Sequence, residues 1–204
     1  MRLNPVTRAF FERSAKLQTG QLAGDMAAVA HTPPDPAAVK RLSLTPYFNA
    51  QLRTTCTPTM LQGGHAENAL PQLARATVNC RMLPSDPKEV QERLEEALAD
   101  PKIKVSPIGQ ACPSNPSPLR PDLMEPLERI TKEMWNVPVV PVMLTGATDG
   151  LYLRNAGIPT YGVSGIFEDI DDVRAHGRDE RIGMKQFHEA REFLYCLVKA
   201  IGGK

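Results

Sequence analysis

The sequence has few aromatic residues, almost no net charge and no long apolar run. Aromatic residues make up 5% of the 204 positions, with a single tryptophan. Lysine plus arginine number 24 and aspartate plus glutamate 23, so the net charge is +1. Without a basic stripe we expect no nucleic-acid partner. No apolar stretch approaches the roughly 20 residues of a membrane helix, so we expect no membrane span.

Closely spaced cysteines are also missing. The four cysteines are Cys56, Cys80, Cys112 and Cys196, and no C-x-x-C motif occurs. We therefore expect reduced thiols that pack as small hydrophobic residues, with a disulfide or a metal role as the alternatives. Prolines, by contrast, number 19 and gather at 33–36, 113–121 and 138–141, where they mark loops. Apolar residues reach 42%, which is enough for a core.

Capping signals predict two helices in the first half of the chain. Asn4-Pro5 is typical of a helix start, and we expect one helix over residues 4–30. A proline-rich loop is expected over 31–37. Asp86-Pro87 predicts a second helix that ends near Asp100.

Alternating side chains predict strands around that second helix. Residues 46–56 and 73–83 alternate with the period of a half-buried strand, and Gly63-Gly64 marks a turn between them. Arg81 falls on the polar face of the second strand, and Ile103–Ile108 is a further short strand. Strand, strand, helix, strand is the order of an antiparallel sheet with helices on one face.

The second half reads as an α/β pattern. A linker over 109–121 separates it from the first half. Helices are expected over 123–134, over 152–155 and from Met184 onward, the last with a buried stripe of Phe187, Ala190, Leu194, Leu197 and Ile201. Apolar runs at 137–144 and 158–163 predict strands that are buried on both faces.

Three short segments could carry chemistry. T-G-A-T-D-G at 145–150 and G-V-S-G at 162–165 each follow an expected strand, where α/β sheets bind ligands. The first could equally be a helix cap and turn, and the second, taken alone, is more often a plain turn. The third, A-H-G-R-D-E-R-I at 175–182, holds a histidine with acidic neighbours that could orient its ring. A lone loop histidine is more often a surface residue than a ligand.

The order of these segments resembles the M20 metallopeptidases. T-G-A-T-D-G, then G-I-P-T-Y-G-V-S-G and A-H-G-R-D-E-R-I, look like the end of that family's catalytic domain. The stretch from Gly63 to Leu98 looks like its inserted lid, or dimerisation, domain. The resemblance implies an α/β protein: an α+β lid with an antiparallel sheet and helices on one face over 1–110, incomplete at its N-terminus, and a partial α/β catalytic domain over 116–204.

The resemblance also implies an activity and a set of site residues. Members of the aminoacylase, carboxypeptidase and succinyl-diaminopimelate desuccinylase type hydrolyse amide bonds in peptides or N-acyl amino acids at a two-metal zinc site, and they form homodimers through the lid. By resemblance His176 is a metal ligand, with Glu180 in support. The residues expected to contact substrate are Asn68, Arg81, Thr148, Asp149 and Gly165, with Arg81 facing the substrate carboxylate.

Most of the family's metal ligands have no counterpart here. The H-x-D pair, the Glu-Glu pair and the bridging aspartate are not found in suitable context, and a catalytic zinc needs about three protein ligands. We therefore expect a fragment with at most one ligand, inactive alone. Two other functions stay open, a non-catalytic dimerisation module and a metal-independent ligand-binding domain. Residues 1–11 show no signal peptide, and the compartment stays open.

Overall fold

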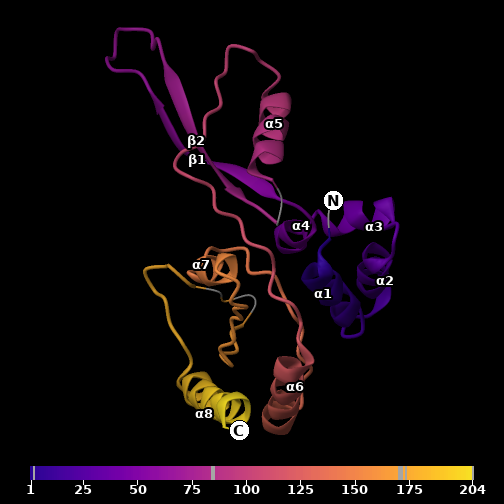
Figure 1. Ribbon diagram of the computed structural model, residues 1–204. Coiled ribbons are helices and arrows are strands. Elements are labelled where there is room, and N and C mark those ends of the chain that lie inside the picture. Colours follow the sequence, from indigo (N-terminus) through magenta and orange to yellow (C-terminus); the bar gives the residue numbers. More distant parts are fainter. Residues whose placement is uncertain (2, 84–85, 170–171, 173, 204) are drawn as a thin grey trace. The chain divides into compact units, whose positions relative to one another are not determined.

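The computed structural model describes residues 1, 3–83, 86–169, 172 and 174–203. Within them it has helices and one two-stranded antiparallel sheet (Figure 1), which confirms the predicted α/β class in its α+β form. The chain divides into two compact units. The first is Met1–Pro116 with Val140–Pro159, and the second is Ser117–Val139 with Thr160–Lys204.

The first unit begins with two packed helices rather than one long helix. The predicted start is confirmed, because the Asn4 side chain accepts hydrogen bonds from the backbone N–H groups of Val6 and Thr7, both at 2.9 Å. The first helix, α1, is Pro5–Ala15 and the second, α2, is Gly20–Ala30. The single helix predicted over 4–30 is wrong, since the chain reverses around Gly20, at φ 61°, and packs α2 back on α1.

Two short helices follow where a loop and a strand were predicted. Helix α3 is Pro36–Leu42, with the Asp35 carboxylate accepting the Ala37 N–H at 2.8 Å, so only 31–35 form the predicted loop. Helix α4 is Pro46–Leu52, which makes the strand predicted over 46–56 wrong in its first seven residues. Proline in the first helical turn and burial of Gln51 and Leu52 on one helical face outweigh the alternation.

The core of this unit lies among the four helices. Phe11, Val29, Ala38 and Leu52 have no exposed surface, and Met26 has 1%. Phe10, Ala30 and Leu42 complete the cluster. At its border the Asp25 carboxylate receives two hydrogen bonds from the Arg41 guanidinium, at 2.6 and 2.8 Å. A charged group of which the side chain is 6% exposed is thus paired.

A β-hairpin follows the helical cluster. Strand β1 is Thr55–Gly63 and strand β2 is Ala74–Arg81, so the strand predicted over 73–83 is confirmed. The ladder runs from Thr55 opposite Arg81 to Gly63 opposite Ala74. It is interrupted once, between Pro58, which lies opposite Val78, and Met60. No residue of either strand is buried, so the covered face that the alternation predicted is not observed.

The hairpin also carries a disulfide. Cys56 and Cys80 lie directly opposite each other and are bonded, which corrects our expectation of reduced thiols for this pair. The alternation of β2 had placed Cys80 on an expected packed face, and with no covering layer its nearest partner is the cysteine across the ladder. Cys112 and Cys196 are free thiols.

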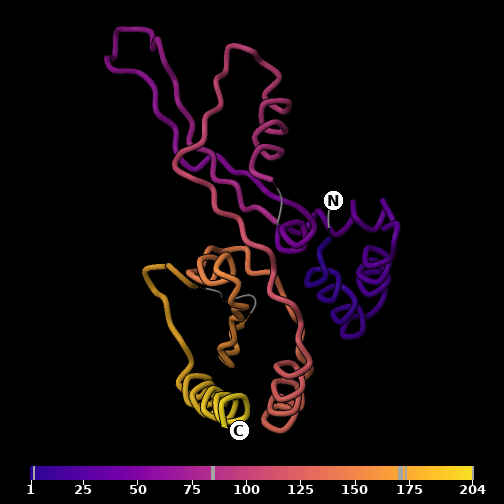
Figure 2. The backbone as a smooth tube through the Cα atoms, viewed as in Figure 1, coloured from indigo at the N-terminus to yellow at the C-terminus, as the bar shows by residue number. Residues whose placement is uncertain are grey.

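Helix α5, Pro87–Leu98, confirms the helix predicted from Asp86-Pro87. The Asp86 carboxylate accepts the Lys88 N–H at 2.9 Å, and Ala99, at φ 50°, ends the helix. The strand predicted at 103–108 is not formed. The tube in Figure 2 shows the chain continuing from there without helix or strand until Pro121.

Two predicted buried strands also lack a ladder. Over 137–144 and 158–163 the chain forms neither helix nor strand, and Leu144 is 66% exposed. A strand exists only as one member of a hydrogen-bonded pair, and the described residues supply no partner for either segment. Between them, helix α7 at Gly150–Asn155 is confirmed, and Gly157, at φ 83°, follows it.

The second unit is a pair of helices. Helix α6 is Pro121–Trp135 and helix α8 is Met184–Gly202, and both were predicted. Their shared core is Met124, Leu127, Ile130, Phe193 and Leu197. The stripe predicted on α8 is only half buried: Ala190 and Leu197 are covered, while Phe187, Leu194 and Ile201 are exposed. No helix in the described part of the chain is long and apolar enough to cross a membrane.

Candidate functional site

The seven predicted site residues fall in both compact units. Asn68, Arg81, Thr148 and Asp149 belong to the first unit. Gly165, His176 and Glu180 belong to the second unit.

Asn68 and Arg81 occupy opposite ends of the hairpin. Asn68 lies in the connection after Gly63, and Arg81 is the last residue of β2, opposite Thr55. The seven residue-to-residue steps of extended strand from Ala74 to Arg81 span roughly 23 Å. Both side chains are exposed. The structure thus leaves each free to meet a ligand but does not bring the two together.

Thr148 and Asp149 form the start of α7. The Thr148 carbonyl accepts the Leu151 N–H at 3.2 Å, and the Asp149 carbonyl accepts the Tyr152 N–H at 3.0 Å. The Asp149 side chain makes no capping hydrogen bond, and both residues are exposed. Their backbone therefore starts the helix, which is one of the two roles the sequence left open.

Gly165 has a packing role that the sequence did not show. Its φ is 66°, in the left-handed region. A Cβ at this position would lie 2.6 Å from Cδ1 and 3.0 Å from Cγ of Phe193, which is 3% exposed. Only glycine meets both conditions without displacing the ring. Its close approach is therefore to the helix-pair core.

His176 and Glu180 belong to one turn. The Gly177 N–H donates to the Arg174 carbonyl at 2.9 Å, and His176 adopts φ 66° within this turn. The backbone N–H of His176 donates to Glu180 Oε1 at 3.3 Å. The predicted carboxylate contact therefore exists, but it orients the backbone of the turn rather than the imidazole ring. His176 is exposed.

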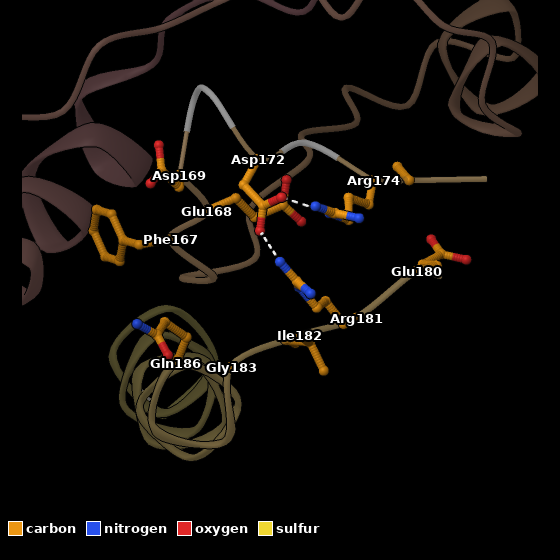
Figure 3. Close-up of a pocket in the computed structure, with 11 residues that line it drawn as sticks. Phe167, Glu168, Asp169, Asp172, Arg174, Glu180, Arg181, Ile182, Gly183 and Gln186 are labelled. Carbon is orange, nitrogen blue, oxygen red and sulfur yellow. Dashed lines mark hydrogen bonds and ion pairs between the residues drawn. The ribbon is translucent and has the colours of Figure 1, made fainter. Parts of the chain in front are cut away.

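A charged hollow of about 280 Å³ lies beside this turn. Figure 3 shows Arg174 and Arg181 pointing at Asp172 from two sides, with hydrogen bonds of 2.5 and 2.6 Å. Arg174 also pairs with Asp179. The hydrogen bonds from Arg181 and then from Arg174 hold the pKa of Asp172 below its ordinary value. Glu168, Glu180 and Gln186 also line the hollow.

This ion network was missed from the sequence. The available signal was the acidic run F-E-D-I-D-D at 167–172 followed by the basic residues Arg174, Arg178 and Arg181. Our interpretation concentrated on the histidine between them. Two members of the acidic run, Ile170 and Asp171, lie outside the described residues.

The donor groups do not fit a metal centre by themselves. Among the residues that the structure describes, no group of three or more His, Cys, Asp or Glu side chains is arranged to hold a metal ion. A catalytic zinc needs about three protein ligands and an open position. His176 can supply one ligand at most, so the described residues do not complete a catalytic zinc site.

Comparison with known proteins shows what the chain is similar to. Residues 14–106 match the family model described as the peptidase dimerisation domain. The chain is 27% identical, over 81% of its own length, to a probable carboxypeptidase S-like protein of Dictyostelium discoideum. It is 29% identical over 80% to an N-fatty-acyl-amino acid synthase/hydrolase of Xenopus tropicalis, and 28% identical over 79% to human aminoacylase-1.

These matches cover only part of each relative. The chain spans 33% of the Dictyostelium and Xenopus proteins and 40% of the human aminoacylase. It therefore corresponds to about a third of the length of the first relatives. No solved structure matches the chain.

Proposed function

Since this chain is a relative of the M20 peptidases and carries their dimerisation domain, we propose that it works in the hydrolysis of amide bonds in peptides or N-acyl amino acids. One observation carries this proposal. Several relatives of the same family align over about 80% of the chain, well beyond the 14–106 segment that matches the dimerisation domain.

The substrate class follows from what the relatives' names share. A carboxypeptidase, an N-fatty-acyl-amino acid synthase/hydrolase and an aminoacylase all imply an amide beside an amino-acid carboxylate. Arg81 is the residue of this chain suited to that carboxylate. It is exposed at the end of a strand, and a guanidinium binds a carboxylate through two parallel hydrogen bonds.

The other predicted residues keep their roles as part of this proposal. Asn68 contacts the substrate from the hairpin tip, and because the tip is roughly 23 Å from Arg81, the two residues of one hairpin serve different bound molecules. Thr148 and Asp149 in the first unit and Gly165 in the second unit are each assigned a substrate contact by family resemblance. Glu180 supports His176 by holding its turn.

This chain supplies only one of the protein ligands that a zinc ion would need. A bound zinc would polarise the amide carbonyl and activate a water molecule. His176 is the ligand we assign to it, and the remaining ligands are not among the described residues. What the chain itself contributes is a dimerisation domain, a carboxylate-binding arginine and this one histidine.

A second function is favoured by the dimerisation match itself. The matched segment includes the whole hairpin, and both outer edges of that hairpin lack a strand partner within the described ranges. Unpaired edges are templates for association. The chain could thus act as a homodimerising module without catalysis.

One experiment separates the two functions. The chain is examined by sedimentation and by hydrolysis of dipeptides and N-acyl amino acids, with and without added zinc. A dimer that turns over substrate with zinc, alone or once joined to a segment that supplies the missing metal ligands, supports the hydrolase. A dimer that stays inactive even when joined to such a segment supports the assembly module. A monomer without turnover contradicts both.

If turnover is observed, Arg81 can be tested against a neighbour on the same strand face. Removing a charged hydrogen-bond partner costs about 1.5–3 kcal/mol, so Arg81→Ala should raise KM by about 10- to 150-fold. Arg81→Lys should recover part of that loss. The matched control is Arg75→Ala, six residues earlier on β2 and also exposed, which should leave KM unchanged.

A further inference from the structure

The hairpin disulfide joins two residues that the ladder itself places in contact. Cys56 and Cys80 are register partners, and their Cα atoms are 4.1 Å apart. This separation is nearer to the roughly 4.5 Å of a non-hydrogen-bonded antiparallel pair, in which opposite side chains approach most closely, than to the roughly 5.5 Å of a hydrogen-bonded pair. The two sulfur atoms are therefore neighbours whenever the hairpin is formed.

The bond lies at the surface of the protein. No residue of β1 or β2 is buried, Cys56 is exposed and Cys80 is half-buried. Structural disulfides resist exchange when thiols cannot reach them, whereas accessible ones exchange readily. Because Cys56 is exposed, we expect a small thiol in solution to reach its sulfur without unfolding.

A hollow of about 470 Å³ adjoins Cys56. Its lining includes Asn49, Arg53, Thr55, Cys56 and Thr57. Arg53, held by a 2.8 Å hydrogen bond to Ser43 Oγ, brings a positive charge to the hollow. Positive charge favours the thiolate, which is the reactive form of cysteine and of a small thiol.

We propose that Cys56 and Cys80 form a reversible exchange site for low-molecular-weight thiols and disulfides. A thiolate attacks the Cys56 sulfur, the bond between the cysteines breaks, and Cys80 leaves as a thiolate that takes up a proton. A second thiol attacks the mixed disulfide and releases Cys56. The sum is two thiols oxidised to one small disulfide and one cystine reduced to two cysteines, and a small disulfide reverses it.

Exchange controls the order of the hairpin. A two-stranded hairpin without a covering layer is only marginally stable. The bond ties its strands at the end where Thr55 faces Arg81, and it closes a loop with a sequence separation of 24. A slip of one residue would turn every side chain to the opposite face. The oxidised form therefore fixes the register of β2, including Arg81. The exchange reaction does not require that the chain takes part in hydrolysis.

The first test counts thiols in the wild-type chain. Purified without reductant, denatured and alkylated, the protein should show two modified cysteines, Cys112 and Cys196, by peptide mass mapping. Prior incubation of the folded protein with reduced glutathione should raise the count to four. Returning it to oxidised glutathione should restore two.

Two results would overturn the proposal. Four free thiols after incubation with oxidised glutathione would show that the pair does not form. Two thiols that persist after a day in reduced glutathione, but rise to four once the chain is denatured, would show a closed structural disulfide. Because the wild-type chain is titrated, neither result depends on whether a variant folds.

The second test measures backbone order. Hydrogen exchange of the β1 and β2 amides should be about tenfold slower in the oxidised than in the reduced form, since a closed loop restricts opening. The amides of α1 and α2 serve as the internal control and should not change. In a Cys112→Ser, Cys196→Ser variant the difference should remain, and in Cys80→Ser it should vanish. Equal exchange in both forms would contradict the effect on order.

Discussion

Two helical cores in this chain are built from similar sequence patterns but differ in how far they are closed. In the first unit four short helices enclose Phe11, Val29 and Leu52 until no surface remains exposed. In the second unit α6 and α8 cover one side of each other, and Phe187 on α8 stays 51% exposed. An amphipathic stripe tells which residues can be buried. Whether they are buried depends on how many neighbours surround the helix.

The largest difference between the two cores should appear on removing a phenylalanine from each. Phe11→Ala empties a fully enclosed site and should cost about 3–5 kcal/mol of unfolding free energy. Phe187→Ala removes a half-exposed ring and should cost within about 0.5 kcal/mol. Urea unfolding followed by circular dichroism measures both. Equal costs would mean that the second core is closed in solution.

The second core is tightest at Gly165, where a side chain would strike Phe193. Gly165→Ala should cost about 2–4 kcal/mol, from a left-handed backbone and an overpacked ring. The matched control is Gly162→Ala, since a Cβ there meets nothing within 4 Å. Thermal unfolding reports both changes. In a Phe193→Ala background the cost at Gly165 should shrink to the backbone part alone, and an unchanged cost would show that the ring is not the obstacle.

The buried carboxylate of Asp25, paired with the exposed Arg41 in the first unit, predicts a pH dependence. The hydrogen bond from Arg41 holds the pKa of Asp25 below its unfolded value of about 3.8. The carboxylate therefore stabilises the fold fully above that value, and the contribution is lost as pH falls through the lower, folded-state pKa. The urea midpoint of the wild type should drop below about pH 4 more steeply than that of Asp25→Asn. Parallel curves would exclude Asp25 as the cause.

The solvent-exposed ion network of Asp172, Arg174 and Arg181 in the second unit should have the smallest effect on stability. Asp172 also has a lowered pKa, but its partners Arg174 and Arg181 are substantially solvent-exposed. Its contribution has the same sign as that of Asp25 and should be screened in about 1 M salt, where the Debye length is about 3 Å. Asp172→Asn should thus lower the melting temperature at low salt and leave it unchanged at high salt. A shift that persists in high salt would place this pair in a less solvated setting.

Helix starts were the part of the fold that local sequence could predict. Asn4-Pro5 and Asp86-Pro87 begin helices because a side-chain oxygen and a proline satisfy the first turn locally. The strands predicted at 137–144 and 158–163 failed for the opposite reason. Their residues favour extended structure, but a ladder needs a partner that sequence alone does not identify. Residues 46–52 alternate like a strand, yet the core draws Leu52 into a helix.

At the candidate site the sequence predicted the exposure of one side chain but none of the contacts. Arg81 was placed on an exposed strand face and is exposed. Gly165 was assigned to substrate contact by family resemblance, and the close approach that the structure shows is to Phe193. The pairing of Asp172 with Arg181 spans nine residues of irregular chain, a distance at which no periodic pattern operates. The cysteine pair of the hairpin became visible only with its register.

Pro58 makes the two edges of the hairpin unequal in their ability to pair with a further strand. Pro58 is two residues from Cys56 on β1, so the backbone groups of both residues point to the same edge of the strand. In the close pair Cys56–Cys80 that edge is the outer one. The nitrogen of Pro58 therefore lies on the outer edge of β1, where proline has no hydrogen to donate. The bulge beside it disturbs the same border. On β2 the residues whose backbone groups point to the outer edge are Ala74, Ala76, Val78 and Cys80, and each of them has an N–H to donate. A further strand can therefore pair with the β2 edge of this small sheet, whereas Pro58 and the bulge oppose pairing at the β1 edge.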